Sequence, residues 1–209
     1  MSDRILFIRT CKADGSAYNG FRWTLKVGAE VRPEKWSPEP ECGNGLHGLK
    51  WGVGDGSLLD WDADAVWIVF SADPADVVDL NGKSKVRVAR VEFVGDRLAS
   101  TSYIIANGAD AATCVGGTAT AGDRGTATAG YGGTATAGDG GTATAGDRGT
   151  ATAGYGGTAT AGYGGIVEVA WWDEEKSRMR RAIGYVGEDG IKAGVAYRCE
   201  GARLVEVRS

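Results

Sequence analysis

The chain has 209 residues and a formal net charge of −4, and 43% of its residues are hydrophobic. This length suits one ordinary domain or two small ones. The charges are spread without the basic stripe that nucleic-acid binding needs, and no run approaches the roughly 18 apolar residues of a membrane span. Residues 1–4 lead directly into an apolar run, so we expect no signal peptide and a cytoplasmic protein.

Cysteine and histidine are too scattered to predict a metal site. The four cysteines follow no Cys-x-x-Cys spacing, and in the cytoplasm we expect them to be reduced. Cys42 lies five residues before His47, the one histidine, but a zinc site would need two more ligands from the distant Cys11 and Cys114. We therefore predict neither a metal nor a cofactor.

Residues 1–108 predict an α+β domain in which strands dominate. Four stretches show the apolar runs or the alternation of strands: residues 5–8, 21–25, 65–70 and 86–94. Residues 58–61 favour a short helix, and residues 75–78 favour a single helical turn.

Residues 117–164 repeat one octad six times, Gly-Thr-Ala-Thr-Ala-Gly followed by two variable residues. A short fixed period is typical of solenoids. Threonine and alanine alternate, so a strand would place them on opposite faces, and the glycines suit tight corners. We predict a two-sided β-solenoid over residues 109–165 with alanine inside. The alternatives are a flexible glycine-rich linker and β-structure that forms only on assembly.

The number of octads in one coil follows from the size of the core. Two octads would give a flat coil of 16 residues, and three would give a triangular coil of 24 residues. The variable pairs themselves tend to repeat every 24 residues. We nevertheless favour 16, because two alanines per octad are too small to fill the wider centre of a triangular coil.

The solenoid would present two kinds of side chain to solvent. Threonine rows are expected on the outward faces: Thr118, Thr120, Thr126, Thr128, Thr134, Thr136, Thr142, Thr144, Thr150, Thr152, Thr158 and Thr160. The corners carry the candidate self-association residues: Asp123, Arg124, Tyr131, Asp147, Arg148, Tyr155 and Tyr163. Aromatic pairs between two solenoids would stabilise a homo-oligomer by about 0.5–1.5 kcal/mol each.

Residues 166–209 predict a four-stranded antiparallel meander that caps the solenoid. Its strands are expected at residues 166–172, 179–186, 191–199 and 204–207, separated by turn residues. A basic cluster, Arg178, Arg180 and Arg181, lies opposite Asp173 and its acidic neighbours. We expect cross-strand ion pairs there and not a phosphate site. The whole chain is therefore predicted to be mainly β.

The octads resemble the octapeptide of bacterial ice-nucleation proteins. The resemblance is carried by Thr-Ala-Gly-Tyr-Gly-Gly-Thr at residues 128–134 and 152–158, and by residues 160–166, which end in isoleucine instead. It implies 16-residue coils, outward Thr-x-Thr rows and stacked tyrosines. Ice binding through the threonine rows is therefore one alternative function, although it needs many rows on a long face and an exported protein, whereas six octads make only three coils.

The whole chain is also similar to a family of uncharacterised phage and prophage proteins. Seven segments carry this resemblance: residues 12–15, 20–23, 27–31, 42–47, 184–192, 197–198 and 204–207. The family has an N-terminal domain of unknown function followed by Ala/Gly/Thr octads. The resemblance implies a phage-encoded protein that acts in the cytoplasm of a bacterial host, and it transfers no known activity.

An enzyme is the second alternative. Residues 45–47 and 58–61 resemble the second conserved region of ADP-ribosyltransferase-like folds. In that interpretation Arg9, His47 and Glu92 would bind NAD and stabilise the developing cation. The aromatic-Ser/Thr-Ser signature of those folds is absent from the sequence, and we favour a structural role for His47.

The hypothesis that the sequence favours is a non-enzymatic binding or assembly protein. The N-terminal domain would recognise a partner, which the phage resemblance suggests is a host protein, such as a component of a defence system. The solenoid would act as a rigid spacer and as a surface for self-association. We therefore expect a homo-oligomer, with neither nucleic acid nor membrane as a partner.

Overall fold

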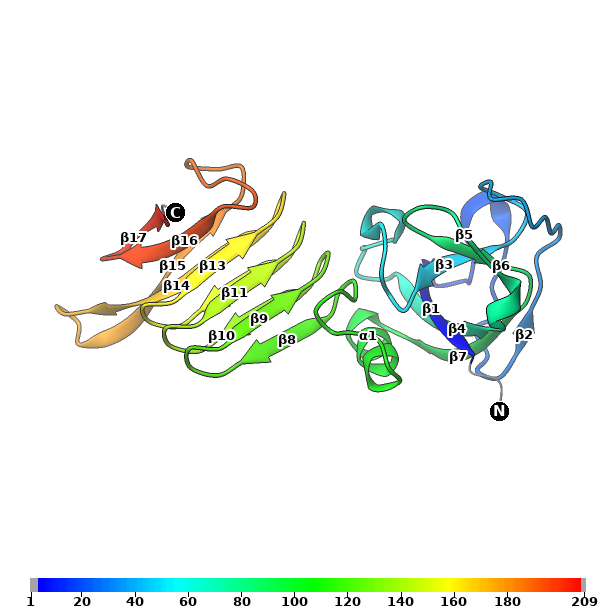
Figure 1. Ribbon diagram of the computed structural model, residues 1–209, viewed down its shortest axis with the longest axis horizontal. Helices are drawn as coiled ribbons and strands as arrows, with labels where there is room; N and C mark the ends of the chain where they lie inside the picture. Colours follow the sequence, from blue (N-terminus) through cyan, green and yellow to red (C-terminus); the bar gives the residue numbers. More distant parts are fainter. Residues whose placement is uncertain (1–3, 208–209) are drawn as a thin grey trace. The chain divides into compact units, whose positions relative to one another are not determined.

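The computed structural model describes residues 4–207, which form two compact units divided after Asp110 (Figure 1). Strands dominate both units, as the sequence predicted. No helix in the described part of the chain is long and apolar enough to cross a membrane.

The first unit is built on a seven-stranded antiparallel sheet in the order β2-β7-β4-β1-β3-β6-β5. The strands are β1 (Ile5–Cys11), β2 (Glu30–Val31), β3 (Leu46–Lys50), β4 (Val66–Ala72), β5 (Val77–Asp79), β6 (Ser84–Val86) and β7 (Ala89–Gly95). The two predicted apolar runs form the central pair, which is in register from Ile5 opposite Ala72 to Cys11 opposite Val66. Residues buried on both sides of a sheet are expected to form such continuous apolar runs.

The two faces of this sheet pack against different parts of the unit. On one face Phe7 stacks on Phe70 with 5.1 Å between ring centroids, and Trp23, which is 3% exposed, packs over Phe70. On the other face lies α1 (Arg97–Ala106), whose Ser100 hydroxyl donates to the Trp67 carbonyl at 3.1 Å. These two faces separate the candidate catalytic residues from one another.

The helix assignments from sequence were only partly right in this unit. The short helix expected at residues 58–61 is a 3-10 turn at Gly56–Leu58, whereas the single turn expected at residues 75–78 is present as a 3-10 turn at Pro74–Asp76. The one α-helix of the described chain, α1, was missed because its interior holds serine, threonine and two adjacent isoleucines, which are weak helix formers. Its N-cap, where the Asp96 side chain accepts the Ala99 N–H at 2.8 Å, was the available signal.

The strand expected at residues 86–94 is in fact two strands. β6 pairs with β3 and β5, whereas β7 pairs with β4 and β2, and three strands lie between them in the sheet. The buried Val86 and Val91 belong to these different strands. Their common valine-rich pattern shows that both are buried, but it carries no information about where the chain crosses the sheet.

The octads of the second unit form a β-solenoid of two sheets, and the octad strands within each sheet are parallel (Figure 1). Its strands are β8 (Thr118–Ala121), β9 (Thr126–Ala129), β10 (Thr134–Ala137), β11 (Thr142–Ala145), β12 (Thr150–Ala153) and β13 (Thr158–Ala161). Thr134 pairs with Thr118 and Thr142 pairs with Thr126, so each octad stacks on the one 16 residues away. The 16-residue coil and the two-sided solenoid are therefore confirmed.

Alanine fills the solenoid and glycine permits its narrow spacing. Ala135, Ala143 and Ala151 are 0% exposed, while the threonines beside them point outward. A Cβ added at Gly133 would lie 2.7 Å from the carbonyl oxygen of Gly117 in the neighbouring coil. Glycine at this octad position is therefore required by the close approach of the next coil's backbone.

The C-terminal strands form two antiparallel hairpins, and they do not form a single meander. β14 (Ile166–Asp173) continues the first sheet beside β12 and turns back as β15 (Arg178–Tyr185). β16 (Ala196–Glu200) instead pairs with β13 of the second sheet and turns back as β17 (Arg203–Glu206). The reason is that both sheets of a solenoid end in an open edge, and one meander would cover only one of them.

The two hairpins also close the alanine core. Val167 and Val169 of β14 are 0% exposed, and Tyr197 of β16 is 2% exposed, all within the same apolar cluster. The Tyr197 hydroxyl accepts the Lys192 N–H at 2.7 Å. Larger side chains therefore replace alanine at the last coil, where the core must be sealed.

Candidate functional site

The outward faces of the solenoid are regular arrays of hydroxyl groups. All twelve threonines of the octads are exposed or half-buried, and each is in register with the threonine 16 residues away. Strand geometry sets the spacing at about 6.8 Å along a strand and about 4.8 Å between coils. Each sheet carries three such Thr-x-Thr strands, so each array is about 10 Å long from its first strand to its last.

The corner aspartates join one coil to the next. The Asp123 carboxylate accepts the Asp139 N–H at 3.0 Å, and the Asp139 carboxylate accepts the Tyr155 N–H at 2.8 Å. At the opposite corner Asp147 accepts the Tyr163 N–H at 2.8 Å. We predicted Asp123 and Asp147 as binding residues from their variable positions, and the structure places both carboxylates in contact with their own solenoid.

The corner tyrosines do not form a continuous ladder. Tyr155 is 55% exposed and follows Asp139 in one corner column, whereas Tyr163 is 75% exposed and lies in the other. Tyr131 shares the column of Tyr163, but Asp147 occupies the coil between them. The structure therefore directs Tyr155 and Tyr163 to opposite edges of the solenoid.

The second corner position adopts a left-handed backbone in every octad. Glycine holds it in four octads, with φ between 61° and 67°, and Arg124 and Arg148 hold it in the other two, with φ of 57° and 55°. Both arginines are exposed. A left-handed conformation is unfavourable for any residue with a Cβ, so the arginines are held there at a cost in stability.

Arg9 and His47 lie on neighbouring strands of the first unit. The Arg9 guanidinium lies 4.5 Å from the centre of the Trp23 ring and donates to the His47 carbonyl at 3.2 Å. Burial lowers the pKa of Arg9 to about 10. Burial also lowers the pKa of His47 to about 4, helped by the nearby Lys83, and its Nε2 accepts the Gly43 N–H at 3.4 Å.

Glu92 does not join these two residues. It lies in β7, with β4 between that strand and β1, and it accepts a hydrogen bond from the Ser71 hydroxyl at 2.6 Å. Ser71 follows Phe70 in β4 and so points to the opposite face of the sheet from Phe70 and Trp23. The structure therefore keeps Glu92 apart from Arg9 rather than gathering an NAD site.

The cysteines give no metal centre in residues 4–207, where no group of three or more candidate ligands gathers. Cys11 and Cys114 are buried and Cys42 is exposed, with the Lys83 ammonium 3.2 Å from the Cys42 sulfur.

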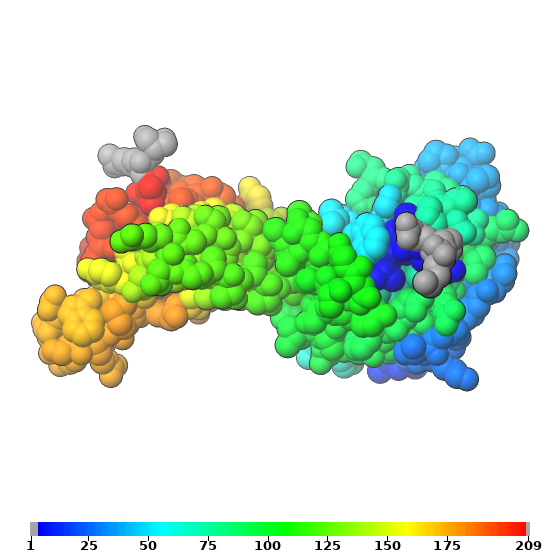
Figure 2. Space-filling view, turned by 60° about the horizontal axis from the view of Figure 1, so that its bottom comes forward, coloured from blue at the N-terminus to red at the C-terminus, as the bar shows by residue number. Residues whose placement is uncertain are grey.

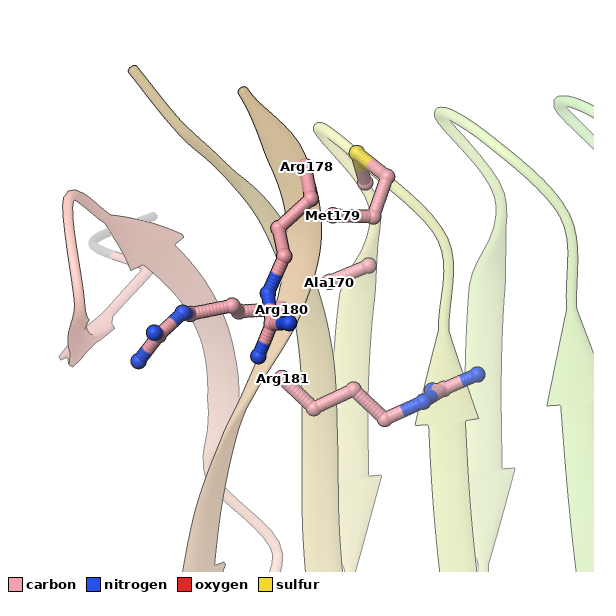
Figure 3. Close-up of a pocket in the computed structure, with 5 residues that line it drawn as sticks. All are labelled: Ala170, Arg178, Met179, Arg180 and Arg181. Carbon is pink, nitrogen blue, oxygen red and sulfur yellow. The ribbon is translucent and has the colours of Figure 1, made fainter. Parts of the chain in front are cut away.

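A hollow of about 490 Å³ lies on the β14–β15 hairpin and is lined by Ala170, Arg178, Met179, Arg180 and Arg181. Figure 3 shows that Arg180 and Arg181 point to opposite sides of the strand. Arg180 pairs with Asp173 at 2.8 Å, and Arg181 lies 3.7 Å from Glu168. The arginines therefore do not converge on one anion. The expected cross-strand ion pair with Asp173 is present, and the pair with Glu168 was not predicted.

Comparisons with known proteins point to the repeats. The chain is 35% identical over 120 residues to an ice nucleation protein of Pseudomonas syringae pv. syringae, which covers 56% of this chain and 10% of that protein. It is 33% identical over 114 residues to the ice nucleation protein InaU of Pantoea ananas, covering 54% of this chain and 11% of that protein. An ice nucleation protein of Xanthomonas campestris pv. translucens matches at 36% over 107 residues.

The chain thus spans about a tenth of the length of the curated relatives that it matches. No family model matches the chain, and no solved structure matches it. The similarity to ice-nucleation repeats and the solenoid together fit a repeat-based, non-enzymatic protein.

Proposed function

We propose that this chain is a non-enzymatic assembly protein whose solenoid is a rigid spacer and a surface for self-association. One observation carries the proposal: the second unit has small side chains inside and large ones outside. Its core is mostly alanine, yet Tyr155, Tyr163, Trp172, Met179, Ile183 and Tyr185 are all between 41% and 75% exposed. Large exposed apolar side chains gathered on one small unit are typical of interaction surfaces.

The solenoid is well suited to the role of a spacer. Every strand from β10 to β13 is hydrogen-bonded to parallel strands on both sides or to a closing hairpin strand. The aspartate contacts at the corners add further bonds between coils. Stability in such arrays comes from neighbouring coils, so the unit holds its outward side chains at fixed spacing.

Self-association is tested by light scattering on the full chain over a concentration series. The proposal predicts a mass that rises with concentration above the 21.7 kDa of one chain. A mass of one chain at every concentration overturns it.

The first unit is proposed to bind the partner, and the resemblance to phage proteins favours a protein of the bacterial host. Tyr18 and Val27 of this unit are 87% and 58% exposed, which offers an apolar contact. We predict that the full chain captures a bacterial protein that is lost when Tyr18→Ser and Val27→Ser are combined. If the native chain and the double variant capture the same protein equally well, or if neither captures one, the proposed role of the first unit in binding a partner is contradicted.

Ice binding is the second candidate function, and the paired threonine arrays favour it. The relatives matched in sequence are named ice nucleation proteins, and both outward faces here carry Thr-x-Thr strands in register. A single chain offers only three such strands per face, so the expected activity is small unless copies assemble. Thermal hysteresis and droplet-freezing measurements test it, and activity equal to that of bovine albumin would remove it.

A further inference from the structure

The first solenoid sheet ends in an apolar surface that its own chain does not cover. The hairpin patch is defined as the outward apolar side chains of β14 and β15: Ile166, Trp172, Met179, Ile183 and Tyr185. β14 has eight residues where β12 has four, so half of the hairpin extends beyond the coils. Figure 2 shows this hairpin as a projecting orange lobe.

The members of the hairpin patch are neighbours by register. Trp172 lies opposite Met179, and Ile166 lies opposite Tyr185. The four that are most accessible, Trp172, Met179, Ile183 and Tyr185, are between 41% and 52% exposed. Alternation along β14 puts Val167 and Val169 into the core and turns these side chains to the face that carries the threonines of β12.

The second sheet shows that closing a sheet does not require such a surface. The outward positions of its hairpin, β16–β17, hold Arg198, Glu200 and Arg203 together with the small apolar side chains of Ala196, Val205 and Val207. Arg198 and Glu200 form an ion pair at 2.6 Å. One face of the solenoid therefore ends in charged and small apolar side chains, whereas the other ends in exposed aromatic and long aliphatic side chains.

Charge within the hairpin patch favours a second copy of the same surface as its partner. Glu168 and Arg181 lie 3.7 Å apart among the apolar residues and are both partly exposed. A surface that carries one charge of each sign is complementary to itself under a twofold rotation, which can place Glu168 of each copy against Arg181 of the other. Pairing through the strand edge is disfavoured instead, because Arg178 and Arg180 on β15 would bring like charges together.

The size of the face sets the expected affinity. Even the whole outward face of this sheet, of which the hairpin patch is a part, is about 24 Å wide across its five strands and about 13–26 Å long, or roughly 300–600 Å². The contact is therefore below the roughly 800 Å² per partner of a standard stable interface. A dimer that forms in the micromolar range is expected, rather than a permanent one.

We infer that two copies of this chain associate face to face through the hairpin patch, with Glu168 and Arg181 exchanged between them. This inference rests on the proposed self-association and names the surface that performs it. The corner tyrosines, Tyr155 and Tyr163, lie outside this contact.

The test uses full-length chains and sedimentation velocity over a concentration series. Ile183→Glu is expected to raise the dimer dissociation constant by at least about tenfold. Thr142→Glu places the same charge on the outward face of the other sheet and is expected to leave the constant unchanged, as is Tyr155→Ser with Tyr163→Ser. Circular dichroism and the melting temperature confirm that each variant is folded.

Mixing complementary variants separates contacts between copies from contacts within one chain. Glu168→Arg alone and Arg181→Glu alone each lose the internal ion pair and are each expected to associate at least about tenfold more weakly. An equimolar mixture of the two is expected to restore dimers, because the basic patch of one copy faces the acidic patch of the other. A mixture no better than its components overturns the inference.

The remaining outcomes separate the two proposals. If the native chain and Ile183→Glu dimerise equally well, the hairpin patch is not the interface, although the proposed self-association is supported. If the dimer is lost in the variant that combines Tyr155→Ser with Tyr163→Ser but not in Ile183→Glu, the interface is formed by the corner tyrosines instead. A native chain that stays monomeric contradicts both proposals.

Discussion

The Asp139 carboxylate accepts the backbone N–H of Tyr155, 16 residues later, at 2.8 Å. This bond joins two successive coils at the corner, beside the backbone bond of 2.8 Å that the Gly140 N–H donates to the Tyr155 carbonyl. The equivalent bond from Tyr163 to Asp147 repeats the arrangement on the opposite edge. The corner residues therefore define the stacking of the coils as well as their outer surface.

Removal of this bond should weaken the solenoid. Asp139→Ala leaves the Tyr155 N–H without its acceptor and is expected to lower the free energy of unfolding by about 1 kcal/mol, the usual net value of one hydrogen bond. Asp139→Asn keeps an oxygen at the same place and should cost less. Urea unfolding of both variants measures the difference, and equal losses would contradict the assigned bond.

The corner arginines should be replaceable with a gain in stability. Arg148 has φ of 55°, and the equivalent residue in four other octads is glycine. Arg148→Gly removes the Cβ from a left-handed position and is expected to raise the free energy of unfolding by about 0.5–1 kcal/mol. Arg203→Gly in strand β17 is the control and should lower it. A loss in both variants would show that Arg148 makes a contact worth more than its backbone strain.

The cap of the alanine core depends on Tyr197. Tyr197→Ala empties a fully enclosed position beside Val167 and is expected to cost about 3–5 kcal/mol. Tyr197→Phe keeps the ring and loses the bond from the Lys192 N–H, together with the long bond of 3.5 Å that the hydroxyl donates to the Gly190 carbonyl, so it should cost about 1 kcal/mol. Thermal or urea unfolding gives both values, and a small loss in Tyr197→Ala would mean that the hairpins are not needed to seal the solenoid.

The first unit should become less stable as the pH is lowered, because of His47. Burial lowers the pKa of His47 to about 4 in the folded state, whereas an unfolded histidine titrates near 6.5. As pH falls from about 7 to 4, the unfolded chain gains a proton that the folded chain excludes, so the folded state loses stability over this window. Below about pH 4 both states are protonated and this contribution stops changing.

His47→Gln removes the titrating group and should flatten that part of the profile. Because carboxylates also titrate near pH 4, the informative quantity is the difference between the native and variant curves. Parallel curves between pH 7 and 4 would contradict the lowered pKa of the half-buried His47.

Strict local repetition made the solenoid predictable from sequence. Alternation of threonine and alanine assigns the two faces, and the small size of alanine selects the flat coil over the triangular one. The corner bonds of Asp139 and Asp147 were not predicted, because they depend on how the next coil stacks. The left-handed position of Arg148 is indicated only by the glycines that occupy the same place in other octads.

Non-local pairing explains what the sequence left open. The valine-rich stretch around Val86 and Val91 divides between two distant parts of one sheet, and nothing in its pattern marks the crossing. Glu92 was paired with Arg9 as a candidate because both lie on strands, but strand order and sheet face separate them. The C-terminal strands were found, whereas their division between two sheets follows from the need to close both edges.

Amide hydrogen exchange through residues 118–161 tests the rigid solenoid most directly. The structure predicts slow exchange in the inner strands β10–β13, where backbone groups bond to neighbours on both sides, and faster exchange at β8, whose alanines are partly exposed. Exchange of all six octads at the rate of an unstructured peptide would contradict the rigid solenoid, because a flexible linker does not present an ordered face.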